Sequence, residues 1–251
     1  MSQIKAHFYI KRILMKPVEN KKQWLSRGYV DQEDIAEFEN KSKKELLELL
    51  QHEYAWVRSS AAYNLSPMDE ESVDALLKRL EKEDKLYTKI AICETLETGN
   101  AFTANKMIEY LSKIGNNQIK ELPKYISNKS SYPLPRDIIA KSLAKMHTSI
   151  FPLLLETLKQ GTIEQKQEVI DAIGYICFNK KELATEKLLN ELIDVYGQNI
   201  DNKIFVWKFL TLLSAFNFEA SKEILNSYLN SKDTLSKEAT HSLDILKEAN
   251  I

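Results

Sequence analysis

The chain has 251 residues, of which 43% are hydrophobic and 28% are charged, values that are ordinary for a globular protein. The 35 Lys and Arg residues balance 36 Asp and Glu, and the net charge of −1 excludes a chain that is basic overall, the usual condition of proteins that hold nucleic acid through phosphate contacts. Only 6 Gly and 6 Pro occur, and such a shortage of turn-forming residues indicates long helices.

The ends of the chain and its cysteines bear on its compartment. Lys5, Lys11 and Arg12 interrupt the apolar run that a signal peptide requires, and no stretch approaches the roughly 20 apolar residues of a membrane span. Cys93 and Cys177 lie in apolar helical stretches and are typical of intracellular core thiols rather than of a disulfide frame. We therefore expect a cytoplasmic protein with no membrane segment.

Residues 1–41 precede a repeating pattern and do not share it. Residues 4–15 fit either a helix or a strand, whereas Asp31 followed by Asp34 is typical of a helix start. We interpret residues 1–41 as a cap over the exposed apolar face of the first repeat, because stacked repeats need such a cover.

From residue 42 onward, a pattern recurs about every thirty residues. A basic residue is followed three and four positions later by a small or apolar pair, and seven positions later by an aliphatic residue. These positions share one face of a helix, so each copy predicts a helix with a buried stripe and a cation near its first turn. The basic residues of the four copies are Arg58, Lys89, Arg136 and Lys166.

An amphipathic stretch precedes each copy, such as Val73, Leu76, Leu77 and Leu80 before the second. Two further pairs continue the pattern with a weaker template up to Leu246. The divisions coincide with residues that commonly end helices. These are Pro67, Gly99, Gly115, Gly161 and Gly197.

The first copy, Val57-Arg58-x-x-Ala61-Ala62-x-x-Leu65, resembles the HEAT-like repeats of phycobilisome-lyase-type and related bacterial proteins. The resemblance covers about Ser42 to Ile251 and is closest in the first two repeats. It implies an all-α, right-handed α-solenoid, a superhelix of about six helix pairs whose second helices line the concave side. With the cap at residues 1–41, residues 42–251 would then form a single continuous domain.

The same resemblance implies a structural role for the four basic residues. The family also favours an acidic residue six positions before each of them. Glu83 before Lys89 fits, whereas His52, Ser130 and Gln160 stand at the other such positions, so a regular acid–base ladder is not expected.

One connection, residues 115–135, is far longer than the other predicted turns. Long connections in compact domains are often functional. Between Thr103 and Ser149 there are 8 basic and 3 acidic residues, a local charge of +5, and Tyr125 and Tyr132 lie within this segment.

Motifs for catalysis or metal binding are absent from the sequence. The four His residues have no second ligand at metal-binding spacing, and there is no HExxH motif, paired-cysteine site, Walker loop, GxGxxG turn or nucleophile elbow. We therefore predict no metal, no cofactor and no catalytic residues.

If the template holds, the residue two positions before each closing aliphatic points into the concave groove. These groove residues are Tyr63, Glu94, Lys141, Asp171, Thr211 and His241. Helices stack about 8–10 Å apart, which places Glu94 and Asp171 roughly 20 Å from each other, too far to act on one bond. Glu94, Lys141 and Asp171 alternate in sign, which fits either a row of ion pairs between repeats or a charged row that faces a partner.

Two aromatic residues near the start of their predicted helices, ahead of Tyr63 and Glu94, can be interpreted in two ways. Trp56 and Tyr87 are candidate recognition anchors in the groove, or they pack between repeats. Residues 204–213 are apolar nearly all round, which favours core packing over an exposed patch.

Two functions remain. The first is a non-enzymatic scaffold or adaptor that binds a protein or peptide along its concave face. The alternative is an AlkD-like DNA glycosylase acting on alkylated bases, a family also built from HEAT-like repeats, which needs a cationic groove, aromatic residues and a carboxylate. Trp56, Tyr63, Tyr87 and Asp171 supply the residue types, but the near-neutral charge makes a nucleic-acid partner the weaker prediction. An accessory role in cofactor attachment shares the family resemblance and has no motif here.

Overall fold

The computed structural model describes residues 21–67, 69–127, 129–230 and 232–248. Helices form in all of these ranges and no strand does. In chain order the α-helices are α2 (Lys21–Ser26), α3 (Gln32–Ala36), α4 (Lys43–Leu49), α5 (Ala55–Asn64), α6 (Glu70–Lys82), α7 (Leu86–Glu97), α8 (Ala101–Ile108), α9 (Ile138–Leu143), α10 (Phe151–Gln160), α11 (Ile163–Asn179), α12 (Glu186–Gln198), α13 (Lys203–Leu213), α14 (Glu219–Ser227) and α15 (Thr234–Glu248). Two 3-10 turns, η1 (Thr148–Ile150) and η2 (Lys181–Leu183), precede α10 and α12.

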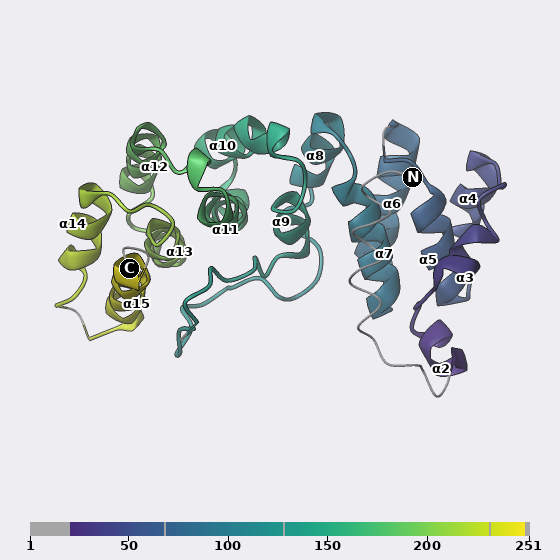
Figure 1. Ribbon diagram of the computed structural model, residues 1–251, viewed down its shortest axis with the longest axis horizontal. Coiled ribbons are helices and arrows are strands. Elements are labelled where there is room, and N and C mark those ends of the chain that lie inside the picture. The colour runs from purple at the N-terminus through teal and green to yellow at the C-terminus, as the bar shows by residue number, and fades with distance from the viewer. Residues whose placement is uncertain (1–20, 68, 128, 231, 249–251) are drawn as a thin grey trace.

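The helices from α4 to α15 stack as consecutive pairs in two rows. The second helices of the pairs, α5, α7, α9, α11, α13 and α15, each contact the next one in the series and form a continuous inner row. The first helices lie outside them, and together the rows make an open arch whose hollow side carries the inner row (Figure 1). The predicted all-α stack of about six helix pairs is confirmed. The right-handed sense of the superhelix stays a prediction.

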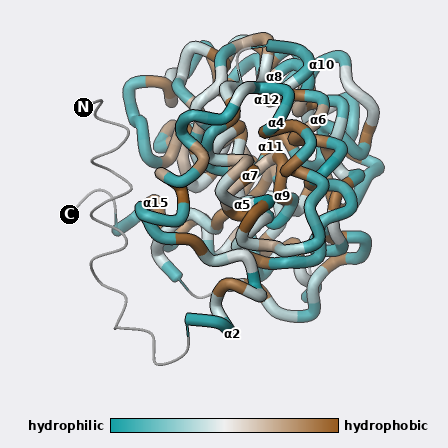
Figure 2. Tube along the Cα trace, turned by 90° about the vertical axis from the view of Figure 1, so that its right-hand side faces the viewer, coloured by the Kyte–Doolittle hydropathy of each residue, from teal (hydrophilic) through white to brown (hydrophobic). Residues whose placement is uncertain are grey.

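The apolar periodicity of the sequence explains why these segments are helical and which face they bury. On α6, Val73, Leu76, Leu77 and Leu80 all have 0% exposure and lie on the face turned to the rest of the stack. Figure 2 shows the same division, with hydrophobic segments (brown) concentrated between the rows and hydrophilic ones (teal) outside. Side chains at the helix starts complete the pattern, as at Thr162, which accepts the backbone N–H of Gln165 while the Gln165 side chain accepts the N–H of Thr162.

Residues 204–213 belong to α13, which is buried on several sides. Phe205, Phe209, Leu210, Leu212 and Leu213 all have 0% exposure. The prediction that this segment packs in the core is confirmed. The small residues of the template are equally buried, and they set the distance at which inner helices can approach one another.

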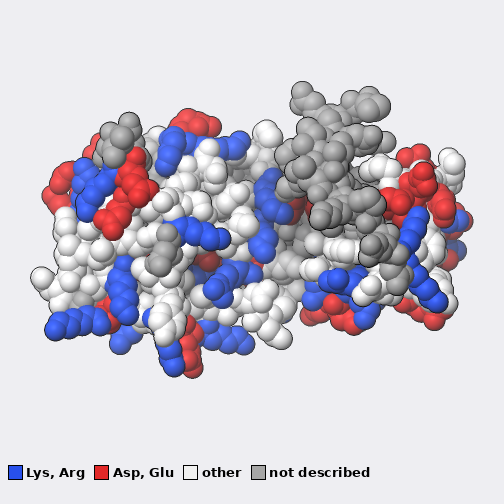
Figure 3. All heavy atoms as spheres, turned by 60° about the horizontal axis from the view of Figure 1, so that its bottom comes forward, with Lys and Arg blue, Asp and Glu red and all other residues white. Residues whose placement is uncertain are grey.

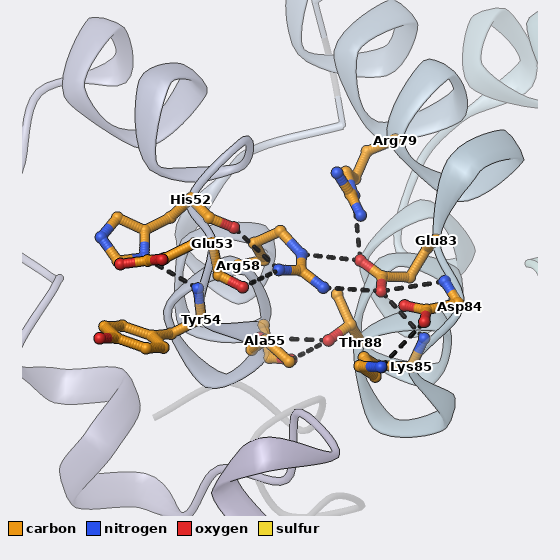
Figure 4. A network of polar contacts seen from close by, with 11 residues as sticks. His52, Glu53, Tyr54, Ala55, Arg58, Arg79, Glu83, Asp84, Lys85 and Thr88 are labelled. Carbon is orange, nitrogen blue, oxygen red and sulfur yellow. Dashed lines mark hydrogen bonds and ion pairs between the residues drawn. The ribbon is translucent and has the colours of Figure 1, made fainter.

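A buried ion pair joins the first two repeats (Figure 4). Arg58 on α5 donates from Nε and Nη2 to the two carboxylate oxygens of Glu83, at 2.8 Å each, and from Nη1 to the carbonyl oxygens of His52 and Glu53. Arg79 also donates to Glu83. Burial opposes ionisation of Glu83, but the hydrogen bonds from Arg58, the Lys85 N–H and Arg79 outweigh it and lower the pKa of this carboxyl.

The pairing of Glu83 differs from the spacing rule that singled it out. Glu83 precedes Lys89 by six residues, yet the guanidinium that it binds is that of Arg58 in the preceding repeat. The physical reason is geometric, since Arg58 reaches across the interface between α5 and the end of α6. The acid–base contact therefore holds two helix pairs together.

The segment before α4 contacts the N-terminal end of the stack. The predicted helix start at Asp31 is confirmed, because Asp31 and Asp34 form a reciprocal cap at the start of α3. Gly28 has φ +86° and lies so close to Thr88 and Ser59 that a Cβ atom there would overlap the Thr88 side chain. The question of a helix or strand at residues 4–15 lies outside the described residues, and the interpretation of residues 1–41 as a cap over the first repeat stays a prediction.

The connection between α8 and α9, residues 109–137, is the long irregular segment expected from the sequence, and we call it the connecting segment. Asp137, which has 0% exposure, holds its two ends together. Its carboxylate accepts the N–H groups of Ile139 and Ala140 at the start of α9, the N–H of Ser112 and the side-chain amide of Gln118. Figure 1 shows the segment reaching from α9 into the hollow of the arch towards α15.

We expect Glu83→Ala to lower the free energy of unfolding by about 3–5 kcal/mol, because it leaves the buried Arg58 guanidinium without its counter-ion. Urea denaturation followed by circular dichroism measures the change. The matched control is Lys43→Ala, which removes an exposed ion pair to Asp69 and Glu71 and is expected to leave the midpoint within error. Equal effects of the two substitutions would contradict a structural role for the Arg58–Glu83 pair.

Candidate functional site

The predicted groove residues fall one on each inner helix. Tyr63 lies on α5, Glu94 on α7, Lys141 on α9, Asp171 on α11, Thr211 on α13 and His241 on α15. The structure brings neighbouring members together in some places and covers them in others. Three environments result, and they are described in turn.

The first environment is a pocket of about 300 Å³ between α7 and α9, which we call the α7–α9 pocket. One side comes from a single face of α7, and the other from α9 and the first residues of the connecting segment. Its lining consists of Leu86, Lys89, Ile90, Cys93, Glu94, Glu97, Ile114, Gly115, Asn117, Arg136, Ile138, Lys141, Ser142 and Lys145. Glu94 and Lys141, two predicted groove residues, therefore line one cavity.

The α7–α9 pocket is lined by more basic than acidic side chains. Glu94 accepts a 2.6 Å hydrogen bond from the hydroxyl of Tyr63, and Glu97 forms a 3.1 Å ion pair with Lys145. Burial raises the pKa of Glu97, and the ammonium of Lys145 opposes that shift. Within 4 Å, no carboxylate of the described part of the chain forms an ion pair with any of the three remaining cations. These are Lys89, Arg136 and Lys141.

The surroundings of the pocket add cationic charge and apolar contact area. Figure 3, in which the lower side of Figure 1 is turned forward, shows Lys and Arg side chains (blue) near the middle of this face. Leu86 is 50% exposed and Ile90 is 37% exposed on the α7 side. Burial raises the pKa of the Cys93 thiol to about 12, which favours its neutral form at pH 7. The lining therefore combines cations that have no ion pair within the described part of the chain with an apolar edge formed by Leu86 and Ile90.

The four cations predicted to be structural have different surroundings. Arg58 is 4% exposed and bonded as described above. Lys89 and Arg136 line the α7–α9 pocket instead, and half-exposed Lys166 forms no ion pair with a described residue. Arg58 is buried because Glu83, six residues before the basic residue of the next repeat, forms an ion pair with it. Lys89, Arg136 and Lys166 have no acidic residue at the equivalent position of the following repeat.

The aromatic residues Trp56 and Tyr87 lie against the N-terminal segment. The ring of Trp56 meets that of Phe38 edge to face at 6.1 Å between centroids. Tyr87 contacts Trp24 and Tyr29, with ring centroids at 5.4 and 5.3 Å. Both rings therefore pack against the N-terminal segment rather than between repeats, and their role as recognition anchors stays a prediction.

Asp171 and Thr211 belong to the second environment, a buried polar cluster on α11, α13 and α15. The ammonium of Lys208, 1% exposed, lies 3.0 Å from Glu168 and 2.9 Å from Asp171. Glu238 accepts hydrogen bonds from the indole N–H of Trp207 and the hydroxyl of Thr211. Asp171 thus pairs with Lys208, so the row of ion pairs proposed for Glu94, Lys141 and Asp171 does not form among these three residues.

The cluster holds three carboxylates and one Lys, and Lys208 pairs with two of the carboxylates, Glu168 and Asp171. Burial raises the pKa of Glu168 to about 7, since the attraction of Lys208 is partly cancelled by the charge of Asp171. Burial also raises the pKa of Asp171 and of Glu238. The cluster therefore holds protons that the unfolded chain would release.

His241 lies in the third environment, a shallow pocket of about 530 Å³ between α15 and the connecting segment. Its other lining residues are Lys124, Tyr125, Ile126, Ser236, Lys237, Thr240 and Asp244.

The residue set suggested for a DNA glycosylase is not assembled. Trp56, Tyr63 and Tyr87 lie on α5 and α7 in contacts with neighbouring residues, whereas Asp171 lies on α11 in its pair with Lys208. Across the described ranges, no group of three or more His, Cys, Asp or Glu side chains could hold a metal ion. In the same ranges no helix combines the length and apolar character that crossing a membrane requires.

The sequence did not single out Glu168, Lys208 or Glu238. One signal was present, because Glu168 and Asp171 are three residues apart and so share a face of one helix. Their partner Lys208 is forty residues from Glu168, on another helix, and no local pattern links them.

Comparison with known proteins adds little. No protein-family model and no curated protein matches the chain. One similar solved structure is the crystal structure of an engineered protein, which is 14% identical, with 99% of this chain and 100% of that chain covered and a TM-score of 0.25. A TM-score this low carries no argument about the present chain.

The cluster around Lys208 predicts a pH dependence of stability. Because the pKa of Glu168 is raised on folding, its contribution to stability is present below pH 4.5 and is lost as the pH rises towards 7. Glu168→Gln does not titrate and so does not lose this contribution. Its free energy of unfolding should therefore rise by about 2 kcal/mol relative to that of the parent as the pH increases from 5 to 8.

Urea denaturation of both proteins at pH 5, 6, 7 and 8 measures this difference. The control is Glu191→Gln. Glu191 is an exposed carboxylate that pairs with Lys159, and this pairing lowers the pKa of Glu191. A difference between Glu168→Gln and the parent that does not change with pH would contradict the raised pKa.

Proposed function

We propose that the chain is a binding module of HEAT-like repeats that holds an acidic segment of a protein partner in the α7–α9 pocket. The observation that carries the proposal is the presence of three cations in one cavity without a carboxylate partner among the described residues. Lys89, Arg136 and Lys141 come from two helices and the end of the connecting segment.

The electrostatics favour an anionic ligand over a cationic one. The four Lys and Arg side chains of the pocket exceed its two carboxylates, and one of these carboxylates, Glu97, already pairs with Lys145. Arg136 can form a bidentate contact with a carboxylate, which adds direction to the attraction. Clusters of this composition commonly recognise acidic motifs.

The apolar edge indicates a peptide rather than a small inorganic anion. Leu86 and Ile90 lie on the same face of α7 as Lys89, and they are among the exposed large hydrophobic residues of the chain. A segment that alternates acidic and aliphatic side chains would meet both features. The rest of the inner row lends rigidity to this site, because α7 and α9 are held by their neighbours on each side.

Charge reversal tests the site directly. A labelled peptide of alternating Glu and Leu residues should bind the parent protein, and the double variant Lys89→Glu/Lys141→Glu should bind it at least tenfold more weakly. Fluorescence anisotropy at about 50 mM salt gives the affinities, because screening weakens exposed charge contacts at higher ionic strength.

Two controls make the result specific. Lys78→Glu changes an exposed cation on α6 in the outer row, and it should leave the affinity within twofold. A peptide with Lys in place of Glu should not bind the parent. Equal affinities for the two peptides, or equal losses in the pocket variant and the Lys78 variant, would overturn the proposal.

The same assay separates the nucleic-acid alternative. A glycosylase of this architecture would bind duplex DNA with an affinity that falls steeply as the salt concentration rises. The geometry favours the peptide, since the aromatic residues that would contact a base are packed in intramolecular contacts. Tight duplex binding together with no binding of the acidic peptide would replace the peptide proposal by the DNA alternative.

A further inference from the structure

The inner surface of the C-terminal half of the arch is occupied by the chain's own connecting segment. Leu122 packs against the hydrophobic core, and the carbonyl oxygen of Pro123 accepts a 2.9 Å hydrogen bond from Thr234 at the start of α15. Tyr132 is 5% exposed, and its ring lies 5.6 Å from that of Phe178 on α11. A non-helical stretch of chain is thus bound across α11 and α15 without forming part of either helix.

The centre of this contact is a notch in α11 at Gly174. A Cβ atom placed there would overlap the hydroxyl of Tyr132, so the ring fits only because residue 174 has no side chain. Glycine is unfavourable in the middle of a helix compared with alanine. Gly174 therefore makes α11 less stable locally, and in return it leaves room for the Tyr132 side chain.

The fit of Tyr132 is incomplete. Its hydroxyl is buried and forms no hydrogen bond with any residue that the structure describes. Burial also raises the pKa of this hydroxyl well above its ordinary value. A buried hydroxyl without a partner is unfavourable, so a phenyl ring would suit the notch better than the phenol that occupies it.

The contact is also limited in extent. Tyr125, which lies between the anchors at residues 122–123 and 132, is 87% exposed. The segment's hold on the notch depends on being part of the same chain, which gives it a high effective concentration.

We propose that the notch at Gly174, together with the inner faces of α11 and α15, is a second recognition surface, for a non-helical partner segment that bears an aromatic side chain. The connecting segment occupies this surface in cis and is displaced when the partner binds. The surface is separate from the α7–α9 pocket, and the proposal does not rest on the acidic ligand of that pocket.

The test uses a peptide of residues 117–134 of this chain as the probe and Tyr132→Ala as the variant that vacates the notch. Tyr132→Ala should bind the labelled peptide at least tenfold more tightly than the parent, in which the cis segment competes. A peptide with Phe at the position of Tyr132 should bind several-fold more tightly still, and one with Ala there should not bind.

A second variant separates binding at the notch from general loosening. Tyr132→Ala/Gly174→Ala fills the notch with a methyl group, and it should no longer bind any of the peptides. The double variant should melt at or above the temperature of Tyr132→Ala, because alanine favours the helix, so loss of binding would not reflect unfolding.

Three results would overturn the proposal. They are failure of the peptide to bind the folded Tyr132→Ala variant, binding that is unchanged by Gly174→Ala, and formation of dimers by exchange of the segment in place of peptide binding, as measured by light scattering. Lys89→Glu/Lys141→Glu should leave binding of this peptide unchanged in the Tyr132→Ala background, which distinguishes the two surfaces.

Discussion

The close stacking of the inner helices is the constraint on which the rest of the structure depends. Most inner helices present small residues that are fully buried: Ala61 and Ala62 on α5, Ala91 on α7, Ala140 on α9, Ala172 on α11 and Ala239 on α15. Small side chains let the helix axes approach, and the apolar area removed from water holds them there. The stacking fixes the position of each polar side chain on the inner face. Each such side chain therefore pairs with a neighbouring residue, is buried by another part of the chain, or faces solvent.

The two halves of the arch meet this requirement differently. Around α7 and α9, the inner face remains open as a cavity, which Lys89, Arg136 and Lys141 line without an ion pair to any described carboxylate. Around α11 and α13, Glu168 and Asp171 pair with the buried Lys208, and Tyr132 of the connecting segment packs against α11 at Gly174 and Phe178. An open cationic site and a buried, largely acidic cluster therefore lie on neighbouring inner helices.

The sequence predicts the fold better than the site, for a physical reason. Helices and their buried faces follow from spacing within one helix, so the template around Arg58, the helix start at Asp31 and the core position of residues 204–213 could all be recognised locally. Whether a polar side chain of an inner helix forms an ion pair or lines an open cavity depends on residues of the neighbouring helix. Glu83 meets Arg58 twenty-five residues away, and Asp171 meets Lys208 rather than Lys141. Tyr132 was noticed in the long connection, but its place at Gly174 depends on a tertiary contact that no spacing in either segment encodes.

The two proposed surfaces consist of different residues, but one stretch of chain, residues 132–137, borders both. Arg136 lines the α7–α9 pocket and acts electrostatically on Asp171, whereas Asp137 holds both ends of the connecting segment through the N–H of Ser112 and the amide of Gln118. A coupling free energy between two sites requires an element whose state both ligands change. Arg136 directly precedes the residue that fixes the connecting segment, and Asp137 cannot shift without releasing the start of α9, where it accepts the N–H groups of Ile139 and Ala140. Any communication between the pocket and the Gly174 notch therefore has its shortest covalent path through residues 132–137, which make contact with both.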